Sequence, residues 1–98
     1  MTRWVAIFND LPGMADIRRE RESLHFDYLK ANRDKIRIGG GLREAPGGAF
    51  LGASWVLETD TRREAVELIE NDPYFRSGFR HYSLLFWGKA FADVPVTL

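Results

Sequence analysis

The sequence contains no cysteine, so no disulfide can brace its fold. It has only two histidines, His25 and His81, and without cysteine these cannot complete the usual zinc cages. We therefore expect no metal and no other cofactor. A single domain of 98 residues buries a modest fraction of its surface. Self-association is then the remaining common source of stability.

An excess of charge of one sign is also missing. The 14 basic and 14 acidic side chains cancel, whereas a nucleic-acid binder normally carries a clear basic excess. No apolar run approaches the roughly 20 residues that span a bilayer, and the segment Met1–Val5 does not resemble a signal peptide. We therefore expect neither a nucleic-acid nor a membrane partner, with the cytoplasm as the default compartment.

What is present is a hydrophobic pattern that changes period along the chain. Short apolar runs predict strands, and spacings of three, four and seven predict a long helix whose inward face carries Met14, Ile17, Leu24, Tyr28 and Ala31, with His25 at its edge. Thr61 and Glu64 fit a capping box that opens a second helix, which Pro73 limits. The predicted order is strand, helix, strand, strand, helix, strand, at residues 4–8, 14–32, 35–38, 50–57, 61–70 and 80–87.

This order predicts one domain over residues 1–98, with a C-terminal tail at 91–98. Pro46–Gly48 is a turn signal that makes the middle strands a hairpin, and the triple glycine Gly39–Gly41 is expected to break or bend the strand before it. Right-handed crossovers then give an α+β ferredoxin-like βαββαβ plait. Its four-stranded antiparallel sheet carries both helices on one face.

The second face of this sheet is predicted to be apolar as well. A sheet with one wet face alternates apolar and polar residues, but Trp4–Phe8, Phe50–Leu57 and Leu84–Trp87 do not alternate. Exposed patches of that kind usually mark an interface. We expect a homodimer in which two sheets stack face to face; the alternative is that the C-terminal tail folds under its own sheet.

Several short segments together resemble one known family. They are Ser23–Leu29 on the first helix, the glycines Gly39–Gly41 and Gly52, and the run Asn71–Tyr74 followed by Ser77–Phe79. In these segments the chain resembles the YciI-like proteins. The resemblance implies a ferredoxin-like fold that forms dimeric α/β barrels, with a pocket holding a His25–Asp72 pair. Some members resemble enzymes that break down aromatic compounds, including by dehydrochlorination.

The residues alone make the same pair a hypothesis. Histidine suits proton transfer near neutral pH, and a carboxylate on its other nitrogen would orient it. The alternative is that Asp72 only caps the turn at Pro73 and His25 is a core histidine. Arg21, one turn before His25, could clamp an anionic substrate, or could pair with Asp72 or Glu70.

Other candidates are less specific. Tyr74, Phe75 and Trp55 could line the wall of an aromatic pocket or could be core residues, and Ser54 lacks the elbow motif of a nucleophile. We predict a cofactor-free enzyme that uses His25 and Asp72 for elimination or isomerisation of a small cyclic or aromatic acid. One alternative is a non-enzymatic dimer that binds a small ligand. Another is an RNA-binding module of the same strand order, although Phe50–Val56 lacks the leading basic residue of that motif.

Overall fold

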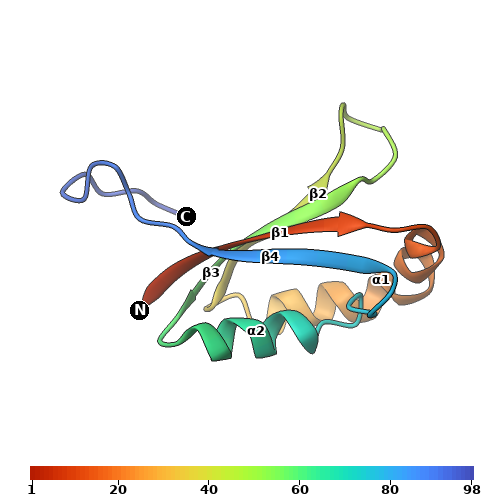
Figure 1. Cartoon of the computed structure of the whole chain (residues 1–98), viewed down its shortest axis with the longest axis horizontal. Helices are drawn as coiled ribbons and strands as arrows, with labels where there is room; N and C mark the ends of the chain where they lie inside the picture. The colour runs from red at the N-terminus through yellow and green to blue at the C-terminus, as the bar shows by residue number, and fades with distance from the viewer.

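The computed structural model describes residues 1–98 and contains the six elements in the predicted order (Figure 1). They are β1 (Thr2–Asp10), α1 (Met14–Ala31), β2 (Ile36–Leu42), β3 (Gly52–Thr59), α2 (Arg62–Glu70) and β4 (Arg80–Phe86). The strands form one antiparallel sheet in the order β2-β3-β1-β4, and both helices cover the same face. The predicted α+β ferredoxin-like fold is therefore confirmed. Neither helix combines the length and the apolar character needed to cross a membrane.

The core lies between the helices and alternate residues of the two central strands. Ala6 pairs with Trp55 across β1 and β3. Both side chains face the helices and are almost completely buried, as the strand period of two requires. The rest of this core cluster comes from all four strands and from α2: Phe8, Ile36, Ala53, Leu57, Ala65, Ile69 and Leu84.

The inward face of α1 differs in part from the predicted one: Met14, Ile17 and Tyr28 are buried or half-buried as predicted, but Leu24 and Ala31 are exposed. Leu24 is 56% exposed, whereas His25, predicted at the edge, is one of the two buried residues of the helix, together with Met14. The inward line runs through Met14, Arg18, Arg21 and His25, in steps of four, three and four residues. Hydrophobicity alone misplaces this line because two of its members, Arg18 and His25, carry polar groups that find partners inside the protein.

The glycine run does not break β2. The strand continues through Gly39–Gly41 to Leu42, which pairs with Gly52. A β-carbon at Gly41 would overlap the ring of Phe50, which lies in the connection before β3. The glycine therefore makes room for an aromatic side chain, and β3 begins at Gly52 rather than at Phe50 as predicted.

The first turn of α2 is capped as a variant of the predicted box. Thr61 Oγ1 accepts a hydrogen bond from the Glu64 amide at 3.1 Å. The Glu64 carboxylate accepts from the amide of Asp60 at 3.4 Å, instead of from that of Thr61. Two backbone donors at the helix start are still satisfied, and the helix ends at Glu70, before Pro73.

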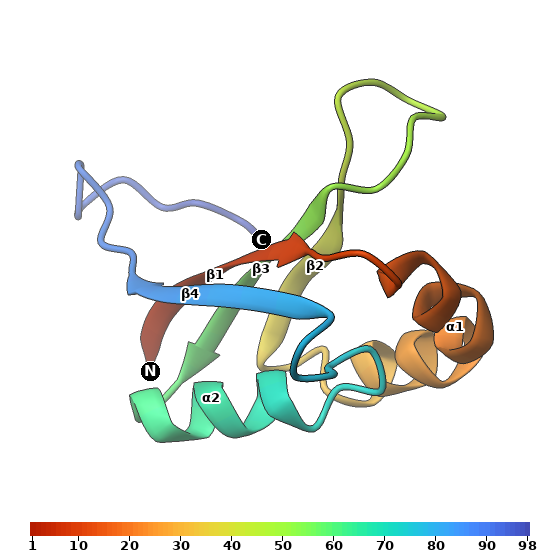
Figure 2. The ribbon, with the colours of Figure 1, turned by 45° about the vertical axis from the view of Figure 1, so that its right-hand side comes forward.

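The face of the sheet away from the helices remains largely open (Figure 2). Ile38, Leu42 and Leu85 project from it and are 43–57% exposed. The segment after β4 loops back on this side of the sheet, where the Trp87 amide donates to the Arg3 carbonyl at 3.1 Å. It reaches the end of the sheet near Arg3 and leaves these apolar side chains uncovered.

Gly52 provides a test of how tightly β1 and β3 approach. A β-carbon there would overlap the backbone carbonyl of Phe8, which cannot move without disturbing the sheet. We expect Gly52→Ala to lower the free energy of unfolding by about 3 kcal/mol, as overpacking does. Gly40 in β2 is the control, because a β-carbon there meets nothing within 4 Å. Urea denaturation should show Gly40→Ala within about 0.5 kcal/mol of the wild type; equal losses for both variants would contradict the packing argument.

Candidate active site

His25 and Asp72 lie side by side under the sheet. His25 comes from α1, and Asp72 follows the last residues of α2. His25 Nδ1 and Asp72 Oδ1 are 2.6 Å apart, and only 8% and 1% of the two side chains are exposed. An ionised carboxylate only accepts hydrogen bonds, so beside it the Nδ1 atom carries a hydrogen and donates it. Nε2 is then the ring nitrogen with a lone pair available to a ligand.

Tyr74 fixes the orientation of this pair. Its ring stacks on the imidazole of His25 with centroids 3.8 Å apart and planes 8° apart. Its backbone amide donates to Asp72 Oδ1 at 3.3 Å, and its hydroxyl donates to the carbonyl of Arg18 at 3.2 Å. The imidazole is thus held by a hydrogen bond in its plane and by an aromatic ring on its face.

The pair belongs to a larger buried cluster of charges. Arg80 Nη1 lies 4.0 Å from Asp72 Oδ2, and Arg80 Nε donates to Asp10 Oδ1 at 3.3 Å. The other oxygen of Asp10 accepts from Arg18 Nε at 2.9 Å. Burial lowers the pKa of Arg80, and the negative charge of Asp10 acts in the opposite direction. The four side chains alternate in sign from Arg18 through Asp10 and Arg80 to Asp72.

A cavity of about 120 Å³ opens beside the imidazole. Its lining includes two of the predicted site residues, His25 and Tyr74. The rest comes from α1, β2 and the β2–β3 connection: Arg18, Glu22, Phe26, Leu29, Gly39–Gly41 and Phe50. The guanidinium of Arg18 lies 4.2 Å from the ring centre of Phe50. The cavity therefore has aromatic and backbone walls with polar groups from one helix.

The remaining predicted residues lie elsewhere. Arg21 is half-buried and lines a groove on the outer side of Asp72, so Arg18 is the arginine that lines the cavity. Phe75 packs edge-on against Tyr82, with ring centres 5.8 Å apart. Ser54 follows Ala53, which faces the helices, and therefore points to the open face of the sheet.

Trp55 is a core residue whose ring centre lies 6.4 Å from that of His25. The sequence reasoning missed Arg18, Glu22 and Phe50. For Arg18 a signal exists, because it precedes His25 by about two helical turns and so shares its face. For Phe50 there is none, since its position depends on how the β2–β3 connection folds back over Gly41.

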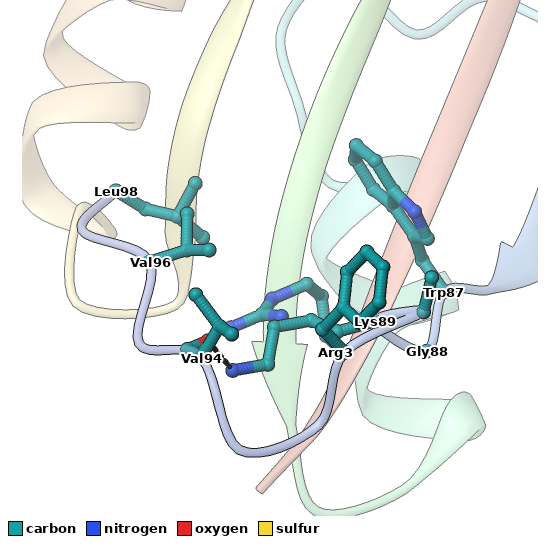
Figure 3. Close-up of a pocket in the computed structure, with 9 residues that line it drawn as sticks. Arg3, Trp87, Gly88, Lys89, Val94, Val96 and Leu98 are labelled. Carbon is teal, nitrogen blue, oxygen red and sulfur yellow. Dashed lines mark hydrogen bonds between the residues drawn. The ribbon is translucent and has the colours of Figure 1, made fainter.

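No group of three or more His, Cys, Asp or Glu side chains comes together as metal ligands would. A second hollow, of about 290 Å³, lies between the C-terminal segment and the sheet (Figure 3). Its walls are largely apolar, with Arg3 and Lys89 as the charged members, and it shares no residue with the cavity beside His25.

The fold and the buried pair define a small α+β domain with a histidine–aspartate site next to a cavity. The model of the YCII-related domain matches residues 2–88. The chain therefore belongs to the YCII-related domain family. A search of curated proteins finds no match.

Among solved structures, the chain is similar to 5-chloro-2-hydroxyhydroquinone dehydrochlorinase from Burkholderia phenoliruptrix AC1100, in complex with 2,5-dihydroxybenzoquinone. The two are 24% identical over 88% of this chain and 93% of that chain, with a TM-score of 0.75. This similarity shows that the two proteins share their fold over nearly their whole length.

The tyrosines around the site predict how stability depends on alkaline pH. Burial raises the pKa of Tyr28 and Tyr74; burial and a hydrogen bond to Glu70 raise the pKa of Tyr82 to about 12. The folded protein thus keeps phenol protons that the unfolded chain loses near pH ~10. This contribution to stability is fully present below pH ~10 and is lost as the pH rises towards about 12.

Phenolate absorbance should therefore be absent below pH ~10 in the folded protein and should develop at lower pH once urea unfolds it. In Tyr82→Phe the step at the highest pH should disappear. A tyrosine that ionises below its ordinary range in the native protein would contradict this assignment.

Proposed function

We propose that this protein is a small cofactor-free enzyme in which His25 acts as the general acid/base and Asp72 orients it. The reaction is an elimination or isomerisation of a small cyclic or aromatic acid. One observation carries the proposal: a short His25–Asp72 contact, buried from water, stands at the wall of a cavity. Such a carboxylate selects one tautomer of the histidine and stabilises the imidazolium that forms during proton transfer.

In this scheme, Nε2 of His25 takes a proton from the substrate. The electron pair of the broken bond moves into the ring, and in an elimination the leaving group departs with its own bonding pair. The proton on Nε2 is then passed to the leaving group or to water, which returns His25 to its starting form. In an isomerisation the same proton is delivered to another atom of the substrate.

The volume and the aromatic lining of the cavity support a single ring as the reacting part of the substrate. An apolar cavity of roughly 150 Å³ holds one benzene molecule, and the cavity of about 120 Å³ is of similar scale. Phe26, Phe50 and Tyr74 offer aromatic surfaces to a planar ligand. The dehydrochlorinase of the same fold, which acts on a chlorinated hydroxyhydroquinone, supports halogenated and hydroxylated rings as first compounds to test.

The decisive measurement is turnover of such compounds, followed by chloride release and by the absorbance of the ring. We expect the wild type to consume at least one of them and His25→Ala to be about 10²–10⁴-fold slower, the usual effect of losing a general acid/base. His81→Ala is the control, because His81 is exposed and lies outside the cavity. Unchanged turnover in His25→Ala would refute the role of His25. Binding without consumption would favour the non-enzymatic ligand-binding alternative.

We also propose that the open face of the sheet pairs with the same face of a second copy. Ile38, Leu42 and Leu85 form an apolar surface over the edge strands, next to the half-buried Val5 and Ile7 of β1. The C-terminal segment adds further exposed apolar side chains at Phe91, Val94 and Val96 instead of covering this surface. Two copies stacked face to face would remove both sets from water, and a chain of net charge zero opposes this association little.

Two leucines of nearly equal exposure test the dimer. Leu85, on the open face, is 57% exposed and Leu24, on the outside of α1, is 56% exposed. Size-exclusion chromatography with light scattering should give a dimer for the wild type and for Leu24→Glu, and a monomer for Leu85→Glu. A monomeric wild type at micromolar concentration would overturn this proposal.

A further inference from the structure

We propose that Arg80 is the positioning residue of the His25–Asp72 pair: its guanidinium balances the Asp72 carboxylate and so leaves His25 free to work as a neutral base. This inference rests on the proposed function, since it explains how His25 would be ready to accept a proton. It concerns a residue at the start of β4 that does not line the cavity.

The two oxygens of Asp72 have different surroundings. Oδ1 is used twice, by His25 Nδ1 at 2.6 Å and by the Tyr74 amide at 3.3 Å. Oδ2 is buried and has no hydrogen-bond partner within the chain, and the cation it faces is Arg80, whose Nη1 is 4.0 Å away. Arg80 Nη2 is likewise buried without a partner in the chain, and both side chains are 1% exposed. The two groups are thus linked by a buried charge contact through Nη1 and not by a hydrogen bond.

The position of Asp72 makes a permanent cation necessary. Its amide donates to the Ile69 carbonyl at 3.3 Å, so the carboxylate lies at the C-terminal end of α2, where the helix dipole is negative. The last turn of α2 carries no basic residue. Burial also disfavours the ionised form of a carboxyl group unless a positive charge is close. Arginine keeps its charge across the physiological range, whereas histidine does not.

The net charge of the cluster then determines whether His25 is neutral or protonated when no substrate is bound. Arg18 and Arg80 carry two positive charges, and Asp10 and Asp72 carry two negative ones. With His25 neutral the cluster has no net charge, and with His25 protonated it has one positive charge. Without Arg80, the charge of Asp72 would be balanced only by a protonated His25. The histidine would then hold its proton to higher pH and would be a base in a smaller fraction of molecules.

The other groups around His25 do not change this balance of charge. From α1, Glu22 lines the cavity and Arg21 lines the groove outside Asp72; their charges are opposite and both are less buried than the cluster. The Tyr74 hydroxyl stays protonated because burial raises its pKa. The sheet contributes Trp55 and the glycines of β2, which carry no charge.

The experiment follows the two histidine side chains by nitrogen-15 NMR across a pH titration, with no substrate present. Because the chain has only His25 and His81, both can be assigned, and the exposed His81 serves as an internal reference. In the wild type we expect neutral His25 to carry its hydrogen on Nδ1. In Arg80→Met, the pH at which His25 takes up its second proton should rise by about one unit, the usual effect of one nearby charge. Arg80→Lys should restore most of the difference.

A second variant should shift the protonation of His25 in the opposite direction. Asp10→Asn removes a negative charge from the cluster with little change in size, so His25 should lose its second proton at lower pH than in the wild type. Arg62→Met is the matched control. Arg62 donates a hydrogen bond to the Leu84 carbonyl in β4, the strand of Arg80, but does not contact the cluster. It should leave His25 unchanged.

A folded Arg80→Met whose His25 titrates as in the wild type, or as in Arg62→Met, would overturn the proposal. If Arg80→Met and Arg80→Lys both fail to fold, and Asp10→Asn does not shift His25, Arg80 has a structural role only and the proposal is again wrong. None of these readings depends on turnover, so they are distinguishable from a failure of the proposed enzymatic function.

Discussion

The hydrogen bond between His25 and Asp72 is the interaction on which the other buried polar groups depend. Placing a carboxylate in the interior costs several kcal/mol unless compensating charges accompany it. Here the compensation extends through Arg80 and Asp10 to Arg18, at the other end of the cavity wall. Apolar residues of similar volume would stabilise a domain of this size at least as well. Stability alone therefore does not explain so many charges in a small core, and their presence supports the proposed catalytic role.

The sequence predicted the plait because its strands are short apolar runs, such as the unbroken run of β1, that are separated by clear turn and helix patterns. It predicted the His25–Asp72 pair through family resemblance, since 47 residues separate the two in the chain and no local pattern connects them. It missed Arg18 and Arg80 because charged side chains are ordinarily assigned to the surface. Their burial makes sense only once the fold brings Asp10 and Asp72 beside them.

The two faces of the sheet differ in what covers them and in what they carry. The covered face combines an apolar core with the charge cluster, so that the side chains of α1 that point inward are in part polar. The open face carries apolar side chains without a covering layer, which is the surface available for association. A second copy on that face would leave the cavity beside His25 accessible from the helix side, because the two lie on opposite sides of the sheet.

The cluster is assembled from β1, α1, the residues after α2, and β4. Its first and last members in the sequence, Asp10 and Arg80, are 70 residues apart. No fragment of the fold contains all of its charges. An intermediate that has formed only one βαβ half would hold a single ion pair, Asp10–Arg18 or Asp72–Arg80. It would lack the Asp10–Arg80 and His25–Asp72 contacts that join the two halves, so it would gain little by burying its charges. The cluster should therefore close late in folding and open early in any partial unfolding, so that the integrity of the site reports on the whole native structure and not on one part of it.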